Sequence, residues 1–182
     1  MTVLIIDTTT ERGIIALGTM EGEITAEKKL PAGFQNSDHL FPALKELGIK
    51  ATALCLIICA TGPGSYTGIR VGAVVAKTLS FIHKIPLVGV CTLEGFSEPA
   101  LIDAKMGGAY ILHAGKWARQ PLEDALRWIG DNVIYTPNAT LLVTKAPLVQ
   151  WQECYPSAER YLRKGLERLS NATTNGDLQI DY

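Results

Sequence analysis

A glycine-rich segment, GPGSYTGIRVG from Gly62 to Gly72, has the residue types and spacing that could hold a phosphate group. The segment follows an apolar run of strand length, Leu54 to Ala60, and leads into a long apolar helix predicted from Ile69 to His83. A strand, a glycine-rich turn and a helix in this order commonly form a phosphate cradle. Glycine lets the backbone approach closely, and the helix N-terminus offers free N–H groups to an anion. The segment therefore predicts a phosphate site.

The residues that would do chemistry on a phosphate are missing. The segment has no GK[ST] sequence, so it is not a Walker A loop. Asp7 ends the first strand and could hold a hydrated metal, but Asp7-Thr8-Thr9-Thr10 lacks the glycine of a DxGT phosphate turn. We therefore predict a vestigial site that binds a nucleotide weakly, with no cofactor required. Its predicted residues are Asp7, Thr8, Thr9, Gly62, Gly64 and Ser65.

Metal and nucleophilic catalysis have no support in the sequence. The histidines, His39, His83 and His113, lie tens of residues apart and form no HxxxH pair. Ser65 lies in GxGSY rather than in a GxSxG elbow, so we interpret it as the N-cap of the following helix. The sequence predicts no catalytic residue and no metal site.

Composition indicates an ordinary globular protein. Of 182 residues, 47% are hydrophobic and 19% charged, and 17 basic against 18 acidic residues give a net charge of −1. With so small a net charge, no overall electrostatic field favours binding to nucleic acid or to a membrane. The four cysteines show no CxxC spacing, and the N-terminus does not resemble a signal peptide, which together predict reduced thiols and a cytoplasmic location. The apolar runs are too short to cross a bilayer.

The elements that must position the glycine segment follow an α/β order. Strands are predicted at Val3–Ile6, Gly13–Met20, Glu23–Leu30, Leu54–Ala60 and Pro86–Val90, with helices from Ser37 or Asp38 to Leu47 and across Ile69–His83. The order β-β-β-α-β-α-β is that of the ribonuclease H-like core shared by actin and sugar kinases. The predicted fold class is α/β, actin-like, with two lobes, mixed sheets and a shortened second lobe.

A boundary is predicted near Glu98-Pro99, giving lobes over residues 1–98 and 99–182. In the second lobe we expect strands at Ala109–His113, Val133–Thr136 and Leu141–Thr144, and helices at Pro121–Ile129 and Pro156–Leu169. The polar tail from Ser170 is expected to be loose. The basic residues of the last helix alternate with glutamates and are expected to be a solvated face rather than an RNA-binding surface.

The helix after the glycine loop carries small residues at every fourth position, Gly68, Gly72, Ala76 and Ser80. Bulky apolar residues surround this small-residue stripe, so the helix must be covered on more than one side. The stripe allows another helix to approach closely. That helix could be the one over 38–47 or one from another chain.

Several motifs resemble the bacterial TsaB (YeaZ-type) family. Besides the glycine segment, they are Ile5-Ile6-Asp7-Thr8-Thr9, Ser37-Asp38-His39-Leu40-Phe41-Pro42, Val88-Gly89-Val90-Cys91-Thr92-Leu93-Glu94 and Asp103-Ala104-Lys105-Met106-Gly107. The resemblance extends from residue 1 to about 112. It implies two ribonuclease H-like lobes and a non-catalytic scaffold role in making threonylcarbamoyladenosine in tRNA.

The resemblance also implies partners. The expected partners are a TsaD-like catalytic subunit and a TsaE-like ATPase. The chain is expected to contact tRNA only through this complex and to make no contact with a membrane. When the chain is alone, it could form a homodimer. The family pairs through its first two helices, which places the interface at His39, Leu40, Leu44, Gly68, Ile69, Gly72, Val75, Ala76, Leu79 and Ser80. The chief alternative function is a small enzyme of the actin-like superfamily that uses ATP or a sugar phosphate. The third possible function is a peptidase. The sequence argues against it because it has neither a metal-binding cluster nor a Ser-His arrangement.

Overall fold

The first of two β-sheets forms the centre of a layered lobe. A computed structural model describes residues 1–33, 36–174 and 176–180. The sheet has the strand order β3-β2-β1-β4-β5. Its strands are β1 (Thr2–Asp7), β2 (Ile14–Thr19), β3 (Ile24–Lys29), β4 (Leu54–Ala60) and β5 (Leu87–Val90). β1 to β3 form an antiparallel meander, whereas β4 pairs in parallel with β1 and with β5. The predicted order β-β-β-α-β-α-β is confirmed.

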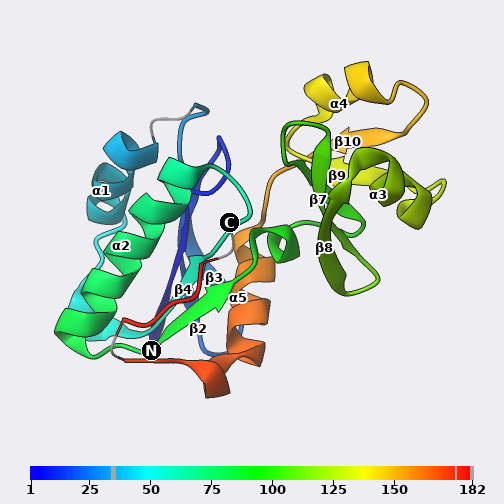
Figure 1. Cartoon of the computed structure of the whole chain (residues 1–182). Coiled ribbons are helices and arrows are strands. Elements are labelled where there is room, and N and C mark those ends of the chain that lie inside the picture. The colour runs from blue at the N-terminus through cyan, green and yellow to red at the C-terminus, as the bar shows by residue number, and fades with distance from the viewer. Residues whose placement is uncertain (34–35, 175, 181–182) are drawn as a thin grey trace.

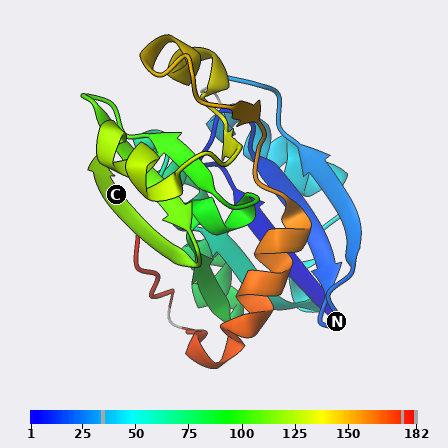
Figure 2. The ribbon, with the colours of Figure 1, turned by 90° about the vertical axis from the view of Figure 1, so that its right-hand side faces the viewer.

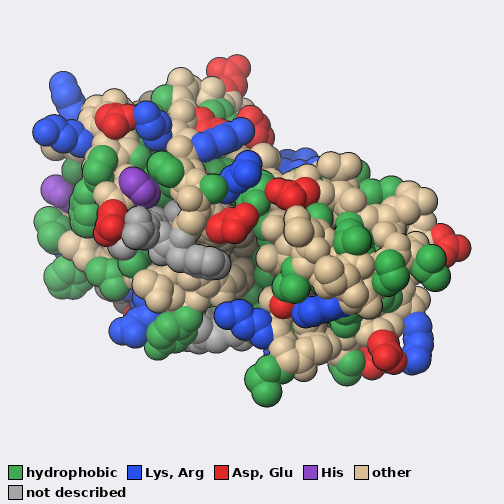
Figure 3. All heavy atoms as spheres, turned by 90° about the horizontal axis from the view of Figure 1, so that it is seen from above, with side chains coloured by type: hydrophobic (Ala, Val, Ile, Leu, Met, Phe, Trp, Pro, Cys, Tyr) green, Lys and Arg blue, Asp and Glu red, His purple; other side chains and the backbone are tan. Residues whose placement is uncertain are grey.

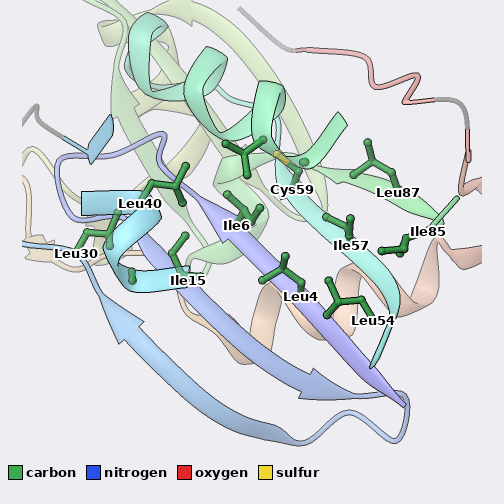
Figure 4. Packing of buried hydrophobic residues seen from close by; sticks show 13 residues of the cluster. Leu4, Ile6, Ile15, Leu30, Leu40, Leu54, Ile57, Cys59, Ile85 and Leu87 are labelled. Carbon is green, nitrogen blue, oxygen red and sulfur yellow. The ribbon is translucent and has the colours of Figure 1, made fainter. Parts of the chain in front are cut away.

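Helices cover both faces of this sheet (Figure 1). They are α1 (Asn36–Glu46) and α2 (Tyr66–His83) on one face and α5 (Ala158–Glu167) on the other. Alternate residues of β1 supply the two cores, because successive side chains of a strand point to opposite faces. Leu4 and Ile6 join the cluster under α1 and α2, drawn in Figure 4, and Val3 and Ile5 join the cluster under α5. This double burial explains the continuous apolar runs of β1 and β4.

The second sheet has the order β10-β9-β6-β7-β8. Its strands are β6 (Ala100–Asp103), β7 (Gly108–His113), β8 (Lys116–Pro121), β9 (Ile134–Thr136) and β10 (Trp151–Glu153), with helices α3 (Leu122–Ile129) and α4 (Ala139–Lys145). A core that includes Leu101, Ile111 and Ala125 forms between the sheet and these helices. The structure also contains the short 3-10 helices η1 (Ala51–Ala53), η2 (Thr92–Gly95) and η3 (Leu169–Asn171). Among the described residues, none of the helices has the length and apolar character needed to span a bilayer.

Two predicted elements of the second half need correction. The strand predicted at Leu141–Thr144 is wrong, because these residues lie in α4. Of the two leucines there, only Leu142 is buried, which one face of a short helix achieves, and a short apolar run does not separate a strand from a helix by pattern. The strands β6, β8 and β10 were not predicted. β8 and β10 are largely exposed and polar, so their sequences lack an apolar run.

The last helix packs on the first sheet, although the predicted division placed it in the second lobe. Tyr161 and Leu162 are fully buried against strands β1 to β5, and Figure 2 shows α5 lying across these strands. The chain thus enters the second sheet near Pro99 and returns before Ser157, whose side chain caps α5. The tail is also more ordered than expected, since Thr173 pairs with Leu87 at the edge of the first sheet.

Candidate functional site

The turn after β1 and the loop after β4 pack directly against each other. The Ser65 N–H donates to the Thr9 carbonyl at 2.7 Å, and the Thr8 hydroxyl donates to the Gly68 carbonyl at 2.6 Å. A Cβ at Gly64 would lie 2.3 Å from Thr9 O, and one at Gly68 would lie 1.9 Å from Thr8 O. Such distances exclude any side chain. The glycines are therefore required by a contact between two parts of the same chain.

The structure brings the predicted phosphate-site residues together, and most of them bond to one another or to nearby residues of the chain, whereas Gly64 is exposed. Thr8, Thr9 and Gly62 are buried, and the Gly62 carbonyl accepts from the Thr92 N–H at 2.6 Å. Ser65 caps α2, as predicted, by accepting from the Gly68 N–H at 3.3 Å. Weak nucleotide binding at this loop stays a prediction.

Asp7 is the centre of a buried hydrogen-bond network. One carboxylate oxygen accepts from the Thr9 N–H at 2.7 Å and from the Thr9 hydroxyl at 2.6 Å, and the other accepts from the Tyr161 hydroxyl at 2.9 Å. The Thr92 hydroxyl donates to the Thr9 hydroxyl at 3.0 Å. Burial raises the pKa of Asp7 although these donors oppose the shift, and burial beside Asp7 raises the pKa of Tyr161. Both Asp7 oxygens are engaged by protein donors, which does not fit the hydrated metal considered from the sequence.

The other reactive groups to consider in the described chain are potential metal ligands and the thiols. Within residues 1–33, 36–174 and 176–180, no three His, Cys, Asp or Glu side chains gather as metal ligands. All four cysteines are free thiols, and burial, with the nearby Asp7 carboxylate, raises the pKa of Cys59 to about 12. A protonated, buried thiol is a poor nucleophile.

The small-residue stripe of α2 faces the chain's own sheet. Gly68, Gly72, Ala76 and Ser80 are all buried, and the Ser80 hydroxyl donates to the Ile85 carbonyl at 2.8 Å. The partner-interface prediction therefore needs correction. Of its other residues, Leu40, Ile69 and Val75 are buried, Leu44 and Leu79 pack on the same core, and His39 is partly exposed. The stripe consists of small residues because Thr8, Ile6 and Cys59 occupy the space beside it.

The opposite side of the two helices exposes large apolar side chains that the sequence reasoning missed. We call this surface the outer face; it consists of Phe41 of α1 and Tyr66, Val74, Phe81 and Ile82 of α2, which are each 58–65% exposed. In Figure 3 hydrophobic side chains gather at the left edge, the side on which α1 and α2 lie in Figure 1. Part of the signal was present in the sequence, since Tyr66, Val74 and Phe81 lie across the helix from its glycines.

A cavity of about 450 Å³ lies between the two lobes. Trp117 of β8 lines it from the second sheet, and Gly89 of β5 and Arg168 line it from the first lobe. The Arg168 guanidinium pairs with the Glu94 carboxylate at 2.6 Å, so the positive charge that lines the cavity is already neutralised. The cavity therefore offers a polar surface without an excess cation for a phosphate.

Comparisons with known proteins agree with this architecture. A family model described as "tRNA N6-adenosine threonylcarbamoyltransferase" matches residues 39–116. The "tRNA threonylcarbamoyladenosine biosynthesis protein TsaB" of Escherichia coli is 28% identical over 146 residues, which are 72% of this chain and 60% of that protein. The Bacillus subtilis protein of the same name is 35% identical over 124 residues, 60% of this chain and 53% of that protein. The chain thus matches little more than half the length of these relatives.

A solved structure described as "YeaZ from Pseudomonas aeruginosa" superposes with a TM-score of 0.78 at 24% sequence identity, covering 100% of this chain and 99% of that one. This likeness shows the fold, two lobes of the actin-like, ribonuclease H-like class.

We expect Gly68→Ala to destabilise the fold. The new Cβ would meet the Thr8 carbonyl, a backbone atom that cannot turn aside, so the free energy of unfolding should fall by about 1–3 kcal/mol. Urea denaturation measures the change. The control is Gly108→Ala, where the nearest atom lies at 3.4 Å and the backbone conformation is ordinary. Equal midpoints for the two variants would contradict the close contact.

Tyr161→Phe should cost about 1.5–3 kcal/mol at neutral pH, because it removes a buried donor to a carboxylate. The raised pKa of Asp7 means that its own contribution to stability is complete at low pH and is lost as pH rises through that pKa. Without the Tyr161 donor the ionised form loses further support. The penalty of the variant should therefore grow as pH rises through the pKa of Asp7.

Urea denaturation between pH 4 and pH 8 tests this dependence. The control is Tyr155→Phe, whose hydroxyl donates to Glu11 at 2.5 Å in a half-buried position, and its smaller penalty should not follow the Asp7 titration. A penalty for Tyr161→Phe that does not change with pH would show that Asp7 is not its partner.

Proposed function

We propose that this chain belongs to the TsaB (YeaZ) family and takes part in threonylcarbamoyladenosine biosynthesis in tRNA as a non-catalytic subunit. Its direct partner would be a TsaD-like threonylcarbamoyltransferase. A TsaE-like ATPase would join the assembly, and tRNA would be met through the complex. The cytoplasmic location and a homodimer of the chain alone stay predictions.

The outer face of α1 and α2 is the observation that carries the binding role. Five large apolar side chains that are more than half exposed on two adjacent helices are costly in a protein without a partner for them. Aromatic residues such as Phe41, Tyr66 and Phe81 are also the types that contribute most to protein–protein contacts. The partner site is thus proposed on the outer face rather than on the buried stripe.

The turn and loop chemistry supports the non-catalytic part of the proposal. Catalysis of phosphoryl or acyl transfer needs a positioned nucleophile, base or metal near the reacting group. Thr9 and Tyr161 instead donate hydrogen bonds to the buried Asp7 carboxylate. A small ATP- or sugar-phosphate-using enzyme is the alternative, and the interlobe cavity is where its substrate would bind.

Phe81→Glu should weaken binding to the TsaD-like subunit without unfolding the chain. Phe81 is 58% exposed, so its stability effect should stay within about 0.5 kcal/mol, whereas a charge placed in an apolar contact should lower the affinity at least tenfold. Titration calorimetry with the purified partner measures the affinity. Leu148→Glu is the matched control, because Leu148 is 98% exposed in the other lobe. If both variants bind alike, the outer face is not the interface.

The purified chain without partners should not turn over ATP. We expect hydrolysis at the level of a buffer blank, measured by phosphate release with and without Mg²⁺. Adding the TsaD-like and TsaE-like proteins and tRNA should yield modified tRNA only when this chain is present. Steady ATP turnover by the chain alone, at ordinary enzymatic rates, would favour the small-enzyme alternative.

A further inference from the structure

The outer edge of β5 lacks the charged residues that protect the opposite edge of the sheet from pairing with other strands. β5 reads Leu-Val-Gly-Val and has no charge, whereas the other edge strand, β3, carries Glu27, Lys28 and Lys29. Charged side chains on an edge strand oppose pairing with other strands, and an uncharged edge invites it. The sheet is therefore protected by charge on one side only.

The chain's own tail covers the β5 edge by wrapping around it. Ala172 packs in the cluster under α5, and Leu178 packs in the cluster under α1 and α2, so the tail passes from one face of the sheet to the other. Between them Thr173 forms an antiparallel bridge with Leu87, through N–H to carbonyl distances of 2.8 and 3.1 Å. Figure 4 shows the tail passing beside Leu87.

The edge has a shaped seat for Leu178. A Cβ at Gly89 would lie only 2.8 Å from the Leu178 Cδ1 atom, so the missing side chain of β5 makes room for this leucine. Gly176 has a φ of +79°, and the position of its Cβ would lie 3.3 Å from the carbonyl oxygen of Lys77 in α2. The tail thus lies between α2 and β5, with one backbone pairing and one apolar anchor.

We propose that the outer edge of β5 is a strand-acceptor site, which the chain's own tail fills in the isolated molecule and the tail of a second copy fills by exchange. The site recognises a segment that makes a backbone bridge at Thr173, turns at Gly176 and places an apolar anchor at Leu178. A second copy is the occupant because it carries this matching segment. The proposal is independent of the proposed function, since β5 and the outer face are different surfaces.

Effective concentration sets which tail occupies the site. A segment joined by a short connection competes at millimolar effective concentration, so a tail in trans binds well only after the tail in cis is released. Leu178→Asp releases it, because a carboxylate would replace a partly buried apolar side chain that packs on the cluster under α1 and α2. The acceptor edge itself is unchanged in this variant.

The first test uses a fluorescein-labelled peptide of residues 172–180 and the full chain. By fluorescence anisotropy, the peptide should bind the Leu178→Asp chain at least tenfold more tightly than it binds the unaltered chain. A peptide carrying the same Leu178→Asp change should bind at least tenfold more weakly. Leu148→Asp, in an exposed loop of the other lobe, is the control chain and should behave as the unaltered one. Failure of the released chain to bind, or equal binding of both peptides, would overturn the proposal.

The second test pairs two complementary full chains. Gly89→Val fills the seat but keeps the tail, and Leu178→Asp keeps the seat but has no anchor. Their mixture should form a one-to-one complex by light scattering that the added peptide dissociates, and this complex should be absent from either variant alone. If the peptide binds but the mixture forms no such complex, exchange between copies is overturned. The peptide test remains valid even where Gly89→Val does not fold.

Discussion

The contact between the Thr8–Thr9 backbone and the first turns of α2 is the constraint on which the rest of the lobe depends. Three glycines, at 64, 68 and 72, allow it, since a Cβ at any of them would lie within 2.6 Å of an atom of this turn. The contact fixes how closely α2 approaches the sheet and which of its faces is buried. Once the small face is used internally, the bulky apolar residues on the opposite side stay largely exposed. The exposed outer face is thus a geometric consequence of the glycine spacing.

The same turn also connects the two ends of the lobe. Asp7 accepts a hydrogen bond from Tyr161 of α5, and Thr9 accepts one from Thr92 of η2. The chain leaves for the second sheet shortly after η2 and returns just before α5. The hydrogen bonds of Asp7 and Thr9 therefore fix both segments that connect the first lobe to the second sheet. Burying Asp7 has a cost, seen in its raised pKa, which its protein donors partly offset.

The sequence predicted those elements whose burial leaves a strong pattern. The central strands β1, β4 and β5, the helix α2 and its Ser65 cap were all predictable from apolar runs, glycine and capping chemistry. Exposed or short elements were not, because β8 lacks an apolar run and α4 contains one too short to assign. The face of α2 that meets the sheet could not be chosen either. A stripe of small residues permits close approach to a sheet or to another helix, and only the position of Thr8 in space decides between them.

Two exposed rings of the outer face already have cations over them in the isolated chain. The Arg70 guanidinium lies 5.3 Å from the centre of the Tyr66 ring, and the Lys84 ammonium lies 4.5 Å from that of Phe81. At an exposed site such a contact contributes about 0.5–1 kcal/mol. This free energy is enough to keep the cations over the rings, where they partly shield them from water. It is also small enough for a partner that buries a ring to displace the cation. Arg70 of α2 and Lys84, the C-cap residue after α2, are both exposed, so moving their side chains away disturbs no buried contact. In the isolated chain, cations therefore partly shield the rings of the outer face. A binding partner can displace these cations and contact the apolar rings.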